Sequence, residues 1–420
     1  MIRVIFFFLL IFLRLKESYI FSWIFNIGPL EIFILSIPVF SIVLISFIKF
    51  EFFNYFEKKR KILISLILLT FSLSMISNNR YIFLFFLEFC SFLIIFLILD
   101  LSKDYDKFTS IIFIITFNMI GSLPFFFVYF CSEEASLYSF FNLICSSRVR
   151  LIYFFFVSLI LARKLPIFFF HFWLTKAHVR ASGVCSIILA GLILKLGRFG
   201  MYKFYPFLWE VGKPLNSIII RFTLLSVLNF RILIIRFFDL KYFVACSSVV
   251  HIALSFPLIL RGSVNGIESR IIMIVGHGLI SFFLFFLVSI IYEFSHNRSF
   301  DFSKSLESLS KFFCFLFYLF FFLNIGVPPF LNFFRELLTF LFILKDSFYS
   351  IIIFFVRILI SCLYLMFCLT KESFRKVEKF IRLENFSYIL VIFFFYFFCY
   401  LNLLILIYFY SLFKNFILWR

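Results

Sequence analysis

The chain has 420 residues, of which 64% are hydrophobic and only 15% are charged, and its mean hydropathy is +1.13. Soluble domains carry about 25% charged residues and cannot bury this much apolar surface, so a soluble enzyme and a disordered protein are both excluded. The net charge is +19, but the basic residues gather in short loops between apolar runs, as in 57–61, 148–150 and 371–382. Such loops orient membrane helices and contact anionic lipids, so we expect lipid contacts and no nucleic-acid partner.

Apolar runs of roughly membrane-spanning length follow one another along the whole chain, which predicts an all-α polytopic membrane protein. The second run is too long for one straight crossing, and a break at Pro29 or Pro38 would raise the count of transmembrane helices from about 13 to about 14. The expected spans are 2–13, 19–49, 62–77, 81–101, 108–131, 151–172, 184–204, 215–236, 242–260, 266–292, 311–343, 348–370 and 386–412.

Two of the expected spans contain prolines in their interior. Pro166 lies within 151–172, and Pro328 and Pro329 lie within 311–343. Proline removes a backbone donor, and an opened helix inside a membrane is tolerated only around a polar cavity or inside protein. Two such broken helices, one in each half of a chain, indicate an inverted-repeat transporter with a site near mid-membrane. Two ordinary proline kinks are the alternative interpretation.

Four ionisable residues lie inside these apolar spans: Glu88, Lys164, Lys195 and Glu336. A charged side chain at mid-membrane costs at least ~2.5–3.5 kcal/mol on insertion scales, so each needs an explanation. Snorkelling or structural pairing is one explanation, and a path for protons, in which a Glu–Lys pair is made and broken, is the other. Four histidines, which titrate near neutral pH, lie in or beside the spans: His171, His178, His251 and His277. The nine cysteines contain no C-x-x-C pair, so we expect no metal or redox centre in this chain.

Seven motifs between about residues 80 and 345 combine into a specific pattern. They are FFLEFCSFLI around Glu88, GSLP at 121–124, KLPIFFFHFWLTKAHVRAS from Lys164, ILAGLILKLGRFGM around Lys195, DLKYFVACSSVVHIAL from Asp239, GHGLISFFLF around His277 and PPFLNFFRELL around Glu336. In their order and spacing the chain resembles the antiporter-like, proton-pumping subunits of mitochondrial NADH:ubiquinone oxidoreductase, respiratory complex I.

The resemblance implies a single membrane domain over 1–420 with about fourteen helices and two inverted repeats, each with one broken helix. The parts it implies are the N-terminal helices (1–80), the first antiporter-like repeat (81–236), the second (237–370), and a C-terminal loop with the last helix (371–420).

The resemblance also implies a function, namely proton translocation across the mitochondrial inner membrane driven by NADH oxidation and quinone reduction elsewhere in the complex. Glu88 and Lys164 would form the switching pair, Lys195 the central relay and Glu336 the terminal group. The auxiliary relay groups would be His171, His178, His251 and His277. NADH, FMN, Fe–S clusters and ubiquinone would be bound by other subunits, and the partners would be other membrane-arm subunits, including neighbouring antiporter-like ones. The T-rich codons of the many Phe, Ile and Leu residues point to an organellar gene.

The chain departs from the family pattern in ways that bear on pumping. Arg180 stands where the family usually has Glu, Thr175 and Ser182 stand at usual Pro positions, and Arg198 and Arg335 stand at usual Gly positions. Two alternatives stay open, and these arginines favour the second of them. One is a cation/proton antiporter subunit of the same fold, and the other is a divergent structural subunit of the membrane arm whose pumping is degraded.

Overall fold

The computed structural model describes residues 58–77, 80–101, 107–131, 147–165, 170–204, 216–236, 239–260, 264–295, 311–326 and short pieces between 332 and 360. These residues are almost entirely helical, which confirms the predicted all-α class. Outside the described residues lie the expected spans before residue 58 and the last expected span. The same holds for Pro166, Pro328, Pro329 and Arg335. The total number of transmembrane helices therefore stays a prediction.

The described helices begin and end close to the predicted apolar runs. They are α4 (Lys58–Ile76), α5 (Arg80–Leu101), α6 (Lys107–Cys131), α7 (Ser147–Lys164), α8 (Phe172–Arg180), α9 (Gly183–Ile188), the π-helical segment η2 (Leu189–Ile193), α10 (Leu194–Lys203), α12 (Asn216–Arg236), α13 (Leu240–Leu260), α14 (Val264–Ser295) and α16 (Lys311–Ile325). The agreement arises because long apolar runs in a membrane have no alternative to helix, where every backbone group must be paired within the segment.

Three of the predicted spans are not single regular helices. The run 151–172 contains the end of α7 at Lys164 and the start of α8 at Phe172. The run 184–204 comprises α9, η2 and α10, whereas we predicted one uninterrupted span. In the run 311–343, α16 ends at Ile325 and is followed by Gly326 with a φ of 92°. Only glycine adopts this left-handed conformation readily, and it is a common way to end a helix.

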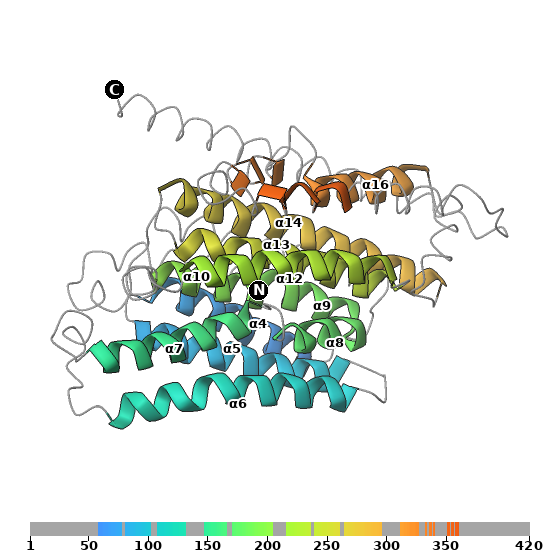
Figure 1. The fold of residues 1–420 in the computed structure, drawn as a ribbon. Coiled ribbons are helices and arrows are strands. Elements are labelled where there is room, and N and C mark those ends of the chain that lie inside the picture. Colours follow the sequence, from blue (N-terminus) through green and yellow to red (C-terminus); the bar gives the residue numbers. More distant parts are fainter. Residues whose placement is uncertain are drawn as a thin grey trace, which may run out of the picture.

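The helices lie side by side, with α6 at one edge of the bundle and α16 at the opposite edge (Figure 1). Sequence neighbours pack in pairs, such as α4 with α5, α12 with α13, and α13 with α14. The α9–η2–α10 segment packs against α5 on one side and α14 on the other, and its residues 184–201 are all buried. This segment is therefore the centre of the bundle, and it joins elements that are far apart in the sequence.

The polarity of the described residues is the reverse of that in a water-soluble protein. Four phenylalanines spaced by three and four positions form an exposed stripe on α5: Phe85, Phe89, Phe92 and Phe96. Meanwhile Arg163, Lys164 and Lys195 are buried. Within the described residues, the segments Ile82–Asp100 and Gly183–Met201 are each long and apolar enough to span a bilayer. An aromatic outer face around buried cations is expected where the surrounding solvent is lipid.

Candidate functional site

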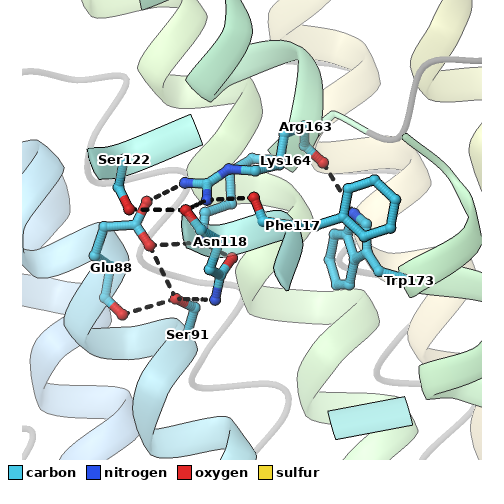
Figure 2. Close-up of polar contacts among 8 residues, drawn as sticks. All are labelled: Glu88, Ser91, Phe117, Asn118, Ser122, Arg163, Lys164 and Trp173. Carbon is cyan, nitrogen blue, oxygen red and sulfur yellow. Dashed lines mark hydrogen bonds and ion pairs between the residues drawn. The ribbon is translucent and has the colours of Figure 1, made fainter. Parts of the chain in front are cut away.

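Glu88 is the centre of a cluster of polar side chains between α5, α6 and α7 (Figure 2). Arg163 and Lys164 are the last two residues of α7, and both reach the carboxylate of Glu88. Arg163 Nη2 forms an ion pair with Glu88 Oε1, and Lys164 Nζ lies 3.5 Å from Oε2. The two cations are buried, whereas the Glu88 side chain is 20% exposed. One carboxylate is thus shared between a permanent cation and a cation that can lose its proton.

Helix α6 completes this cluster through Asn118. The Asn118 side chain accepts a hydrogen bond from Lys164 Nζ at 3.4 Å and donates one to Ser91 Oγ at 3.2 Å. Ser91 Oγ in turn donates to the Glu88 carbonyl oxygen at 2.7 Å and lies 3.4 Å from Oε2. Asn118 therefore links the lysine of α7 to the helix that carries the carboxylate.

The Arg163 side chain is held firmly on the surface of α6. Its Nη1 donates to the carbonyl oxygens of Phe117, at 2.8 Å, and Asn118. The guanidinium lies against Gly121, where a Cβ atom would come within 2.8 Å of Nε and 2.9 Å of Cζ. The carbonyl oxygen of Arg163 accepts a hydrogen bond from Trp173 Nε1 at 3.0 Å, which ties the end of α7 to α8. The absence of a side chain at Gly121 makes room for this arrangement.

Lys195 lies at the start of α10 and is fully buried. Its Nζ donates to the carbonyl oxygen of Ala190 in η2 at 2.6 Å and to Ser281 Oγ of α14 at 3.3 Å. Both of these acceptors are uncharged, in contrast to the carboxylate that Lys164 approaches. Lys195 is therefore held by neutral oxygen atoms.

Two of the predicted histidines face each other across α13 and α14. The ring centroids of His251 and His277 lie 5.5 Å apart, and Arg198 Nη2 lies 3.5 Å from His277 Nδ1. Arg198 is within electrostatic range of Lys195. Lys195 lies about one helical turn before Arg198 on α10. Lys195, Arg198 and the two histidines thus form a second polar cluster in the middle of the bundle, called the central cluster below.

The other two predicted histidines pack against aromatic rings. His171 contacts Phe230, with 4.4 Å between the ring centroids. His178 stacks on Phe285 at 4.4 Å, and neither of its ring nitrogens has a hydrogen-bond partner within the described part of the chain. His178 is also within electrostatic range of Lys195 and Lys241. His178 therefore lies near two buried lysines, Lys195 and Lys241.

Glu336 lies beside the end of α16. Its carboxyl carbon is 3.4 Å from the position that a Cβ atom would take at Gly326, and its side chain is only partly buried. Nearby, Asn324 Nδ2 donates to Ser247 Oγ of α13 at 3.1 Å, and Asn332 Nδ2 donates to the Leu323 carbonyl oxygen at 2.9 Å. Glu336 therefore lies against the glycine that ends α16.

Residues 77–361 match the family model described as NADH:quinone oxidoreductase/Mrp antiporter, TM, which covers more than half of the chain. The chain belongs to this family. A curated relative, NADH-ubiquinone oxidoreductase chain 4 of Caenorhabditis elegans, is 30% identical over 294 residues, which are 69% of this chain and 69% of that protein. These findings confirm the resemblance to the antiporter-like subunits of complex I.

Solved structures show the same fold. The chain is similar to one in respiratory complex I from Thermus thermophilus with bound NADH, with a TM-score of 0.76, 18% identity and coverage of 88% of this chain and 80% of that chain. It is also similar to a chain of the Mrp complex from Dietzia sp., with a TM-score of 0.70, 14% identity and coverage of 83% and 66%. The antiporter-like helical fold is therefore shared by a redox-linked complex and a complex of the Mrp type.

All eight residues singled out from the sequence lie within the part of the chain that matches the family model. The structure brings Glu88 together with Lys164, and His251 together with His277. Lys195 belongs to the central cluster. Glu336 stands at the end of α16, against Gly326.

Sequence reasoning missed several buried polar residues in and around these clusters. Arg163 was not singled out, although it is a second charge in the apolar run directly before Lys164. Lys241 was also missed because it lies near the start of an apolar run, where a lysine is expected to reach the membrane surface. In the structure Lys241 is buried, and its Nζ donates to the carbonyl oxygen of Ala181 at 3.0 Å. Asn118 and Ser281 are neutral, so no charge in an apolar run marked them.

Proposed function

We propose that the chain is a proton-translocating subunit in the membrane arm of NADH:ubiquinone oxidoreductase. The observation that carries this proposal is the buried arrangement around Glu88, in which one carboxylate is within reach of Lys164 and Arg163 in a member of this family. Charges inside a membrane protein are costly and are retained where protons or ions move. The similarity to NADH-ubiquinone oxidoreductase chain 4 supplies the partner reaction.

The proposed path begins at the Glu88–Lys164 pair. When the pair separates, Lys164 loses its compensating charge and passes its proton inward, toward Lys195. Lys195, held by neutral oxygens, receives the proton and passes it toward His251 and His277. Glu336 is the terminal group of this path, and His171 and His178 are auxiliary groups.

The fold proposed to support this path consists of two inverted repeats over 81–236 and 237–370. Each repeat contains a helix broken near its prolines, one after α7 and the other after α16. Broken helices expose unpaired backbone groups in the middle of a membrane protein, where these groups bind water and ions. The ends of α7 at Lys164 and of α16 near Glu336 support this assignment.

In this proposal the chain carries protons and the electrons flow elsewhere. NADH, FMN, the Fe–S clusters and ubiquinone are bound by other subunits of the complex. The chain lies in the mitochondrial inner membrane, next to other antiporter-like subunits and to membrane lipids. Its task is to convert a conformational or electrostatic signal from those neighbours into proton transfer.

A cation/proton antiporter is a second candidate, which the shared fold with the Mrp complex favours. A structural subunit with degraded pumping is a third, which the buried Arg198 beside Lys195 favours, since a permanent cation there opposes a second positive charge. The three functions differ in whether proton movement requires NADH and in whether it requires Glu88 and Lys195.

The test is reconstitution of the whole complex into sealed vesicles, with protons counted per NADH oxidised. Glu88→Gln and Lys195→Met are each expected to lower the proton count while the complex still assembles. An unchanged count in both variants would support the structural role and contradict the proposal. Cation exchange by vesicles without NADH, lost in the same variants, would instead support the antiporter.

A further inference from the structure

Among the described residues Glu88 has two cationic partners, Arg163 and Lys164, and they differ in how firmly they are held. Arg163 is bound to the Phe117 and Asn118 carbonyl oxygens of α6 as well as to Glu88 Oε1. Within the described part of the chain, the contacts of Lys164 Nζ with Glu88 and Asn118 are long, 3.5 Å to Glu88 Oε2 and 3.4 Å to Asn118 Oδ1. Arg163 is therefore the fixed partner of the carboxylate, and Lys164 is the loosely held one.

The two side chains also differ in chemistry. A guanidinium group stays protonated under all physiological conditions, whereas a lysine ammonium loses its proton readily when buried. If Lys164 were the single partner of Glu88, its departure would leave a carboxylate uncompensated in a medium of low dielectric constant, which is strongly unfavourable. With Arg163 in place, the carboxylate keeps an ion pair after Lys164 has left.

From this geometry we propose that Arg163 is a positioning residue that holds the charge of Glu88 and so allows the Glu88–Lys164 contact to be broken and remade. This inference rests on the proposed function, because it assigns a task within the same proton path. Arg163 touches no transferred proton and acts through Glu88. Its own position depends on Gly121, since a Cβ atom there would come within 2.8 Å of the Arg163 Nε atom.

The experiment uses the whole complex in sealed vesicles and measures the rate of NADH-driven proton pumping per assembled complex. Arg163→Gln removes the permanent cation, and pumping is expected to fall at least roughly tenfold, as expected when a buried charged group loses a partner. Arg163→Lys, which keeps a cation, is expected to restore part of the rate. Lys203→Met on α10 is the control, because Lys203 bonds to the end of α4, away from Glu88, and is expected to pump at the wild-type rate.

A double mutant separates action through Glu88 from a general effect on folding. If Arg163 acts through Glu88, then Arg163→Gln combined with Glu88→Gln pumps no more slowly than Glu88→Gln alone. A double mutant that is clearly slower, or an Arg163→Gln variant with the wild-type rate, would overturn the inference. Should Arg163→Gln fail to assemble, Gly121→Ala displaces the guanidinium while keeping its charge. A wild-type pumping rate in Gly121→Ala would overturn the inference equally.

The outcomes also distinguish this inference from the proposed function. If Glu88→Gln and Lys164→Met both leave pumping unchanged, the proposed function itself is wrong. If those two variants lower pumping and Arg163→Gln does not, the proton path stands and the role of Arg163 alone is refuted.

Discussion

A substitution of Lys195 best tests whether a buried lysine serves proton pumping or the stability of the fold. The Lys195→Met variant replaces a fully buried amino group by an apolar side chain of similar length. The lost contacts are the hydrogen bonds to the Ala190 carbonyl oxygen at 2.6 Å and to Ser281 Oγ at 3.3 Å. Ser281 keeps a partner, since its hydroxyl also donates to the Gly278 carbonyl oxygen at 3.0 Å.

The expected change in stability is small because two large effects oppose each other. Hydrogen bonds to a charged group contribute about 1.5–3 kcal/mol each, so the two bonds of Lys195 contribute about 3–6 kcal/mol when its amino group is protonated. Removing an ammonium group from water costs several kcal/mol even after the protein relaxes. The free energy of unfolding of Lys195→Met is therefore expected to lie within about 2 kcal/mol of wild type. The number of protons pumped per NADH, in contrast, is expected to fall.

The matched control is Lys203→Met, the same substitution at another lysine of α10. Lys203 Nζ lies 3.3 Å from the carbonyl oxygens of Ser74 and Met75 and also contacts that of Ser77, so it caps the C-terminal end of α4. Removing a cation from the end of a helix costs up to about 2 kcal/mol. We expect Lys203→Met to assemble less well and to melt earlier, with the wild-type number of protons per NADH.

The assay combines the amount of assembled complex on native gels, its melting temperature and the protons pumped per NADH in vesicles. Lys195→Met should change the third quantity alone, and Lys203→Met the first two alone. A Lys195→Met complex with the wild-type proton count would refute the relay role. A Lys195→Met complex that fails to assemble would refute the expectation that the lost hydrogen bonds and the relieved cost of desolvation nearly cancel.

Two further variants test the packing around these sites. Gly191→Ala places a Cβ atom on the ring of Phe282, and this overpacking is expected to destabilise the bundle by about 1–3 kcal/mol; the melting temperature should fall, and Phe282→Leu in the same chain should restore part of it. Asn118→Ala removes the hydrogen bonds to Ser91 and Lys164, each worth about 1 kcal/mol; vesicle assays should show slower pumping with normal assembly.

The contrary outcomes are equally specific. An unchanged melting temperature for Gly191→Ala would mean that α14 does not press against the π-helical segment. A wild-type pumping rate for Asn118→Ala would mean that Lys164 needs no neutral partner when it leaves Glu88.

The helical class and the family were predictable because their signals are carried along the chain itself. The α5 and α13 sequences are long apolar runs, and their helices lie close to the predicted bounds. The motifs around Glu88 and Lys195 identified the family because their order and spacing are retained, even though each is weak alone. The pairing of Glu88 with Lys164 was expected from that resemblance, since no periodicity places two helices side by side.

The interruption of the central helix was not predictable from local sequence. The segment from Gly183 to Lys203 has the composition of one regular span, yet Leu189–Ile193 is π-helical. The ring of Phe282 from α14 occupies the space beside Gly191, and a contact of this kind depends on tertiary packing. The same holds for Arg163, whose ion pair with Glu88 requires the open surface that Gly121 leaves on α6.

The partners of the buried cations follow their chemistry. Within the described part of the chain, the carboxylate of Glu88 takes its shorter ion pair from Arg163, which cannot lose its proton. Lys195 and Lys241 donate instead to carbonyl and hydroxyl oxygens. A neutral oxygen accepts a hydrogen bond both from an amine and from an ammonium. These lysines would therefore keep their hydrogen-bond acceptors after losing a proton. A carboxylate would hold the charged form strongly and oppose that release. In the proposed proton path, the neutral acceptors of Lys195 and the arginine at the Glu88 carboxylate would therefore favour the movement of a buried proton.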